Sequence, residues 1–207
     1  AWDSRMQTLD LRERTLPDGA TLAKVVESKP ALKEVDLTGS SLSEEEAEAL
    51  AAAFPSVLFI REVPLDGETV SADVTELTLE SGKISEETIR DLAKFPLLET
   101  LNLPNASFED VQAVHEAYPD LSLAFSCGGI TVEAGAEALD LPGEGSVDEE
   151  ALLRALECAP SVRRVDLTGR ELSMEQRKAL AEGRADVAFA YEFSLCGVTV
   201  ANDAETI

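Results

Sequence analysis

Six short apolar-x-apolar segments recur along the chain, and each has the two-residue alternation of a strand that buries one face. Successive segments start 26, 42, 24, 38 and 26 residues apart, so two units make one super-repeat. We therefore predict a single repeat domain over residues 1–207, with about three super-repeats of two units each. The segments are Leu9-Asp10-Leu11, Val35-Asp36-Leu37, Leu77-Thr78-Leu79, Leu101-Asn102-Leu103, Leu139-Asp140-Leu141 and Val165-Asp166-Leu167.

A helix is predicted after each of these strands, because a good N-cap residue is followed by apolar residues at helical spacing. Three serines also have the Ser-x-x-Glu/Gln spacing of a capping box: Ser43, Ser146 and Ser173. Proline ends most of these helices, since the residue before a proline avoids helical geometry. The predicted N-caps are Ser43, Ser85, Ser107, Ser146 and Ser173, with Pro17-Asp18 at the start of the first helix, and the helix-ending prolines are Pro30, Pro55, Pro96, Pro119 and Pro160.

In every second unit the proline is followed by a longer alternating strand and then by a two-residue turn that ends in glycine. In the first such strand, Val57, Phe59, Arg61 and Val63 form one face. Glycine accepts positive φ without steric cost, so an X-Gly pair between two β-prone runs predicts a hairpin. The three predicted turns are Asp66-Gly67, Gly128-Gly129 and Cys196-Gly197.

The strand and its flanking apolar positions resemble the leucine-rich repeat family, whose pattern reads LxxLxLxxNxL. The clearest match is Leu32-Lys-Glu-Val35-Asp-Leu37-Thr-Gly-Ser40-Ser-Leu42, in which Ser40 replaces the family's Asn. The resemblance implies a ribonuclease-inhibitor-like α/β solenoid, in an atypical variant with β-hairpin insertions. We accordingly predict a mainly parallel sheet on one side, helices on the other, and recurrent β-hairpins.

The formal net charge of −24 opposes binding to nucleic acid and to an anionic membrane surface. No run of 18 apolar residues occurs, so we predict no direct membrane insertion. The acidic, lysine-poor composition and the elaborated repeats favour a bacterial protein that is extracellular or on the cell surface, with a cytoplasmic location as the alternative. A charge of this sign suits a basic partner or a divalent cation.

No catalytic motif is present, and we predict that the chain is not an enzyme and carries no cofactor. The only histidine, His115, falls on a predicted helix, and nothing frames a site for it beside Cys127. The three cysteines lie 31 and 38 residues apart, far from the spacing of common zinc sites. We expect all three to be unpaired within one chain.

The middle residues of the six strands point away from the core and form a column that is rich in aspartate. Adjacent parallel strands lie about 4.8 Å apart, so Asp10 should lie beside Asp36, and Asp140 beside Asp166. We predict a non-enzymatic protein-interaction module that presents this acidic face to a protein partner. The alternatives are a structural spacer that displays another domain and a divalent-cation-binding module. The predicted contact residues are Asp10, Glu34, Asp36, Asp140, Arg164 and Asp166.

Both ends of the sequence lie within a repeat. The last residue, Ile207, falls on the first core position of a seventh unit. Repeat arrays need polar end caps to stay soluble, and neither end has one. We therefore expect the chain to be a fragment of a longer array, with end-to-end self-association through an exposed apolar edge.

Overall fold

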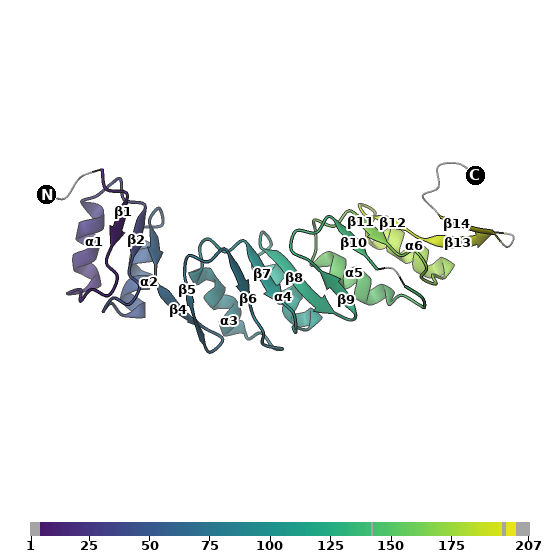
Figure 1. Cartoon of the computed structure of the whole chain (residues 1–207), viewed down its shortest axis with the longest axis horizontal. Coiled ribbons are helices and arrows are strands. Elements are labelled where there is room, and N and C mark those ends of the chain that lie inside the picture. Colours follow the sequence, from purple (N-terminus) through teal and green to yellow (C-terminus); the bar gives the residue numbers. More distant parts are fainter. Residues whose placement is uncertain (1–4, 142, 196–197, 202–207) are drawn as a thin grey trace. The chain divides into compact units, whose positions relative to one another are not determined.

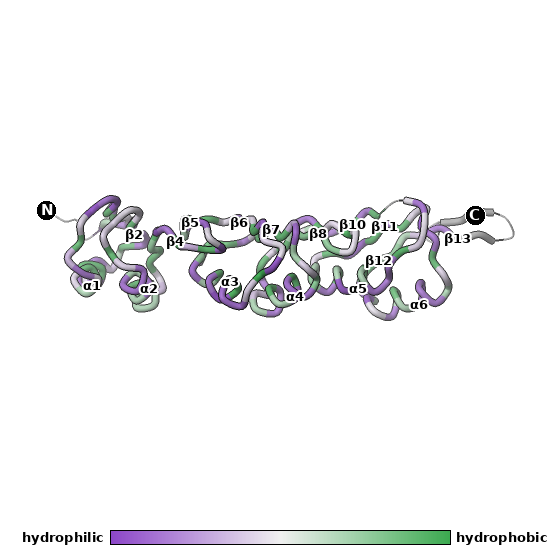
Figure 2. Tube along the Cα trace, turned by 90° about the horizontal axis from the view of Figure 1, so that it is seen from below, coloured by the Kyte–Doolittle hydropathy of each residue, from purple (hydrophilic) through white to green (hydrophobic). Residues whose placement is uncertain are grey.

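The computed structural model describes residues 5–141, 143–195 and 198–201. The chain divides into two compact units. Unit 1 comprises residues 1–75 and 85–98, and unit 2 comprises residues 76–84 and 99–207. Figure 1 labels the helices and strands, and Figure 2 shows that the helices of each unit lie on one side of its strands.

Unit 1 contains a three-stranded parallel sheet in the order β1-β2-β3, a separate hairpin and a layer of helices. The register of the sheet aligns Leu9 with Val35 and Val35 with Phe59. Its elements are β1 (Thr8–Asp10), α1 (Gly19–Glu27), β2 (Glu34–Asp36), α2 (Glu44–Ala53), β3 (Leu58–Ile60), β4 (Glu62–Leu65), β5 (Glu68–Ser71), α3 (Glu86–Asp91) and the 3₁₀ helix η1 (Leu92–Lys94).

Unit 2 contains a four-stranded sheet in the order β6-β7-β8-β9, a three-stranded parallel sheet β10-β11-β12 and a hairpin β13-β14. Strand β8 pairs parallel with β7 and antiparallel with β9. The elements are β6 (Glu76–Thr78), β7 (Thr100–Leu103), α4 (Phe108–Ala117), β8 (Ser122–Cys127), β9 (Ile130–Val132), β10 (Ala138–Asp140), α5 (Glu149–Glu157), β11 (Arg164–Asp166), α6 (Met174–Gly183), β12 (Ala188–Ala190), β13 (Glu192–Leu195) and β14 (Val198–Ala201).

The predicted leucine-rich-repeat-like solenoid is wrong. The described strands instead form several small separate sheets in a mixed α/β fold, and none of these sheets is curled or closed. Unit 2 shows the physical reason. The edge of β8 that a further parallel strand would need is occupied by β9, which pairs with Phe125 and Cys127. Strand β10 therefore begins a new sheet instead of extending the first one.

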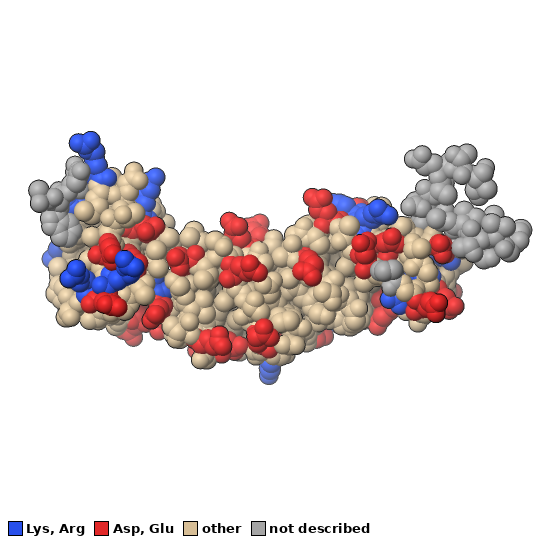
Figure 3. Space-filling model, in the orientation of Figure 1, with Lys and Arg blue, Asp and Glu red and all other residues tan. Residues whose placement is uncertain are grey.

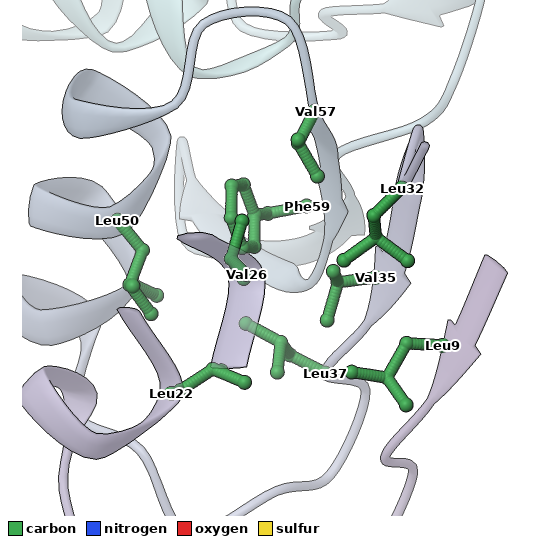
Figure 4. Close-up of a cluster of buried hydrophobic side chains, with 10 residues drawn as sticks. Leu9, Leu22, Val26, Leu32, Val35, Leu37, Leu50, Val57 and Phe59 are labelled. Atoms are coloured by element: carbon green, nitrogen blue, oxygen red, sulfur yellow. The ribbon is translucent and has the colours of Figure 1, made fainter. Parts of the chain in front are cut away.

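The core of unit 1 lies between its helices and its parallel strands. Figure 4 shows Leu22 and Leu50 from the helices facing Leu37, which directly follows β2, and Phe59 of β3. Val35 at the centre of β2 is fully buried. The buried cluster consists of Leu9, Leu22, Val26, Leu32, Val35, Leu37, Ala47, Leu50, Val57 and Phe59.

The helix N-termini follow local side-chain chemistry. Ser43 and Ser173 form the predicted capping boxes with Glu46 and Gln176. The prediction for Ser146 is wrong, because Asp148 caps α5 by accepting a hydrogen bond from the Ala151 N–H. Ser146 instead forms an isolated parallel bridge with Glu171.

The turns predicted at Gly67 and Gly129 are present. Gly67 has φ 84° and joins β4 to β5, and Gly129 has φ 77° and joins β8 to β9. Strands β13 and β14 also pair antiparallel, but the predicted Cys196-Gly197 turn lies outside the described residues.

Candidate functional site

In unit 1, Asp10 and Asp36 occupy equivalent positions on adjacent strands. The parallel register pairs Leu9 with Val35 and Asp10 with Asp36. Leu9 and Val35 are buried, so the strand alternation turns the two aspartates away from the core. Glu34 is on the same face of β2 as Asp36, because the two residues flank Val35. The structure therefore brings these three predicted contact residues together.

Arg12 neutralises much of the charge of this pair. Its Nε and Nη2 donate to the two carboxylate oxygens of Asp10 at 3.0 and 2.8 Å. Its Nε also lies 3.5 Å from Oδ2 of Asp36. Hydrogen bonds from the Arg12 side chain and backbone lower the pKa of Asp10 to about 2. Arg12 was not among the predicted contact residues, although it is two residues from Asp10 and so has the spacing that places both on one face of an extended chain.

The same side chains border a surface hollow of about 530 Å³, which is lined by Asp10, Arg12, Glu13 and Arg14. Two cationic and two anionic groups are therefore present in one place. Figure 3 shows basic and acidic side chains together in this N-terminal part of unit 1. The surface here has mixed charge, and Asp36 and Glu34 on β2 extend its acidic part.

In unit 2, Asp140 and Asp166 are aligned in the same way, since β10 pairs Asp140 with Asp166 of β11. Arg164 lies on the same face of β11, and its Nη2 is 4.0 Å from Oδ2 of Asp166. Asp166 accepts a hydrogen bond from the Thr168 backbone N–H at 2.9 Å. Hydrogen bonding to Thr168 is the main reason that the pKa of Asp166 is lowered.

Asp140 differs from Asp10 in its surroundings. It is exposed, and its carboxylate makes no hydrogen bond or ion pair with any residue that the structure describes. In the sequence, Pro142 stands where Arg12 stands relative to Asp10, so no cation is supplied from that position. The pair in unit 2 therefore has two carboxylates and only the distant guanidinium of Arg164.

The first sheet of unit 2 has neutral residues at the corresponding positions. Asn102 is aligned with Thr78, and its Nδ2 donates to Oγ1 of Thr78 at 3.2 Å and to Oε1 of Glu76 at 2.9 Å. These hydrogen bonds satisfy the side chains within the sheet face. The aspartate column is thus interrupted within unit 2.

Three further features bear on chemistry. Among the described residues, no three His, Cys, Asp or Glu side chains come together as metal ligands would. Cys127 donates to the carbonyl of Ala106 at 2.9 Å, and burial raises the pKa of its thiol. Burial also raises the pKa of Cys158, at the end of α5, to about 11. Both thiols are free, and neither has the lowered pKa of an activated nucleophile. Cys196 lies outside the described residues.

Within the described parts of the chain, no helix combines the length and the apolar character that crossing a bilayer requires. Comparison with known protein families finds no model that matches this chain, and comparison with curated protein sequences finds no match. The resemblance to leucine-rich repeats therefore stays a prediction from the residues.

Proposed function

We propose that the chain is a non-enzymatic protein-interaction module that binds a basic partner through the acidic faces of its short parallel strands. The observation that carries this proposal is the register of β10 and β11, which aligns Asp140 with Asp166 and leaves Asp140 without a partner among the described residues. Lysine or arginine from a partner would relieve the repulsion between two carboxylates on adjacent strands.

We expect the acidic face of unit 1 to contribute less to partner binding than the face of unit 2. Arg12 already binds Asp10 with two hydrogen bonds and lies near Asp36, so a second cation gains less there. The divalent-cation alternative is disfavoured at this pair for the same reason, because a guanidinium holds both oxygens of Asp10. The net charge of −24 supports a basic partner for either face.

The test is the association rate of a partner captured with the full-length protein and then identified. We expect the rate to fall as salt rises, because exposed charges are screened over a Debye length of about 8 Å at physiological salt. The Asp140→Asn and Asp166→Asn double variant should slow association severalfold. The Asp10→Asn and Asp36→Asn double variant should slow it less.

A control variant, Glu45→Gln with Glu175→Gln, removes the same number of charges from the exposed first turns of α2 and α6. It should change the rate little if the strand faces are the binding surface. An affinity that ignores salt and both pairs of aspartate substitutions would contradict the proposal. A protein that retains no partner through this region would instead act as a spacer.

For location, we propose the bacterial cell surface or the extracellular space, on the basis of the acidic, lysine-poor composition. The test is protease treatment of intact cells that make the full-length protein. Digestion of this region in intact cells supports the proposal, and protection until the cells are lysed contradicts it.

A further inference from the structure

Arg61 in unit 1 lies between β3 and β4, and the sequence alternation places it with the residues that face the core. The residues at alternate positions from Val57 to Leu65 are all buried, and Arg61 is the only charged one among them. It comes two residues after Phe59, which the parallel register aligns with Val35. In unit 2, Leu123 and Phe189 have the same place in the parallel register as Phe59. The residues two positions after them are Phe125 and Tyr191, so both parallel-strand segments of unit 2 have an aromatic residue where unit 1 has Arg61.

The side chain of Arg61 is almost entirely buried and has no counter-ion among the described residues. The residue is only 7% exposed, and its Nη1 is buried with no hydrogen-bond partner. Its side chain forms no ion pair with any residue in the described part of the chain. Burying an unpaired charge is costly, and arginine stays protonated instead of neutralising. A ligand that supplies the missing anion would remove this cost.

Glu48 and Asp91 form ion pairs with Lys94, although Oε1 of Glu48 is buried without a hydrogen-bond partner among the described residues. The Nζ of Lys94 lies 2.7 Å from Oε1 of Glu44, 3.0 Å from Oε1 of Glu48 and 3.2 Å from Oδ1 of Asp91. These contacts connect α2 with α3 and η1 and hold the acidic groups on the lysine. They also raise the pKa of Lys94, chiefly through the hydrogen bond to Glu44.

A pocket of about 640 Å³ opens beside Arg61, and this volume is in the range of small-molecule sites. Its walls come from α2, from β3 and from α3 with η1, all within unit 1. Arg90, which is exposed, also lines it. The apolar part of the lining consists of Ala51, Ala52, Pro55, Val57, Phe59, Ala93 and Pro96.

We infer that this pocket binds a small monocarboxylate with an apolar body, whose carboxylate pairs with the guanidinium of Arg61. The planar guanidinium matches a carboxylate with two parallel hydrogen bonds. The apolar lining takes the rest of the molecule. A phosphate dianion fits less well, because the carboxylates of Glu48 and Asp91 also line the pocket and share the single positive charge of Lys94 with Glu44.

The test is calorimetric titration of the protein with 3-phenylpropionate, with its neutral amide and with inorganic phosphate. We expect saturable binding of the carboxylate, binding of the amide that is about tenfold weaker or more, and no binding of phosphate. Equal binding of carboxylate and amide overturns the inference, as does the absence of saturable carboxylate binding. Preferential binding of phosphate also overturns it.

The matched variant is Arg61→Phe, because phenylalanine is the residue at the equivalent position of β8, Phe125. We expect it to keep the far-ultraviolet circular dichroism spectrum of the native protein and to lose carboxylate binding by tenfold or more. Arg163→Gln, a substitution of an exposed arginine in unit 2, should leave binding unchanged. If Arg61→Phe does not fold, Arg61→Gln serves as the second variant. Native affinity in a folded variant at position 61 contradicts the inference.

Discussion

The hairpins β4–β5 in unit 1 and β8–β9 in unit 2 close with the same kind of turn but differ in what surrounds it. Both central residues have positive φ in each turn: 51° and 84° at Asp66 and Gly67, and 58° and 77° at Gly128 and Gly129. Such values are typical of the type I′ turn that suits two-residue hairpins. Asp66 is exposed, whereas a Cβ at Gly128 would lie 3.0 Å from Cε2 of Phe108 and 3.3 Å from Cβ of Ala151.

The two hairpins also differ in how they leave the parallel strands. Phe59 in unit 1 and Leu123 in unit 2 pair with the central residue of the preceding parallel strand. The turn begins seven residues after Phe59 but only five residues after Leu123. In unit 1 the strand breaks at Arg61 and the hairpin forms its own sheet. In unit 2, β8 continues without a break, and β9 completes its sheet. The shorter connection thus keeps the hairpin in the sheet, where α4 and α5 contact its turn.

The largest effect is expected from Gly128→Asp, which copies the residue of the first turn into the second. The left-handed conformation and the clash with Phe108 together should cost about 2–4 kcal/mol of unfolding free energy. The reciprocal change, Asp66→Gly, should stay within about 0.5 kcal/mol, because that turn is in solvent. Urea denaturation followed by circular dichroism measures both. Equal losses for the two substitutions would mean that helix packing does not distinguish the turns.

Substitutions at the second turn position, Gly67 and Gly129, should cause a smaller loss of stability that is equal in the two hairpins. Gly67→Val and Gly129→Val both place a β-branched residue at positive φ, and no atom lies within 4 Å of the added Cβ in either turn. Each should cost about 1–2 kcal/mol, because the penalty comes from the backbone alone. The same denaturation experiment applies. A difference of more than about 1 kcal/mol between the two variants would contradict this explanation.

The smallest effect concerns the aspartate pairs. Arg12→Ala should raise the pKa of Asp10 from about 2 part of the way to its ordinary value of 3.8, because the side-chain hydrogen bonds from Arg12 are lost while the backbone N–H of residue 12 still donates to Asp10. A lowered folded-state pKa stabilises the fold above the unfolded value, and this contribution disappears as the pH falls from about 4 to about 2. The variant should lose part of this pH dependence, and the change in stability should be small because the pair is exposed.

Carbon-13 NMR titration of the aspartate carboxyl groups measures the change at Asp10. Asp166 in unit 2 is the internal control, since hydrogen bonding to Thr168 is the main cause of its lowered pKa. The prediction is contradicted if the pKa of Asp10 stays near 2 in the Arg12→Ala variant, or if the pKa of Asp166 shifts in parallel.

Local patterns predicted those features of the fold that depend on a few neighbouring residues. Ser43 and Ser173 cap their helices as expected, and the X-Gly pair predicted the turn at Gly67. The alignment of Asp140 with Asp166 was also predictable, because identical strands at equal spacing share one register. The prediction of Ser146 as the N-cap of α5 was wrong, since Asp148 two residues later has an equally suitable side chain and caps the helix.

The sequence by itself therefore determined the order of strands and helices, the turns at Gly67 and Gly129 and most of the core-facing residues. These features follow from alternation, capping and glycine geometry, which act over a few residues. Only the tertiary structure decided that the parallel strands fall into separate sheets, because that depends on whether β9 or another strand takes the free edge of β8. It also decided that Arg12 neutralises Asp10 and that Arg61 is buried with no counter-ion in the part of the chain that the structure describes. Which charged side chains form ion pairs depends on their direction and burial, and the alternation of residues along a strand does not predict these.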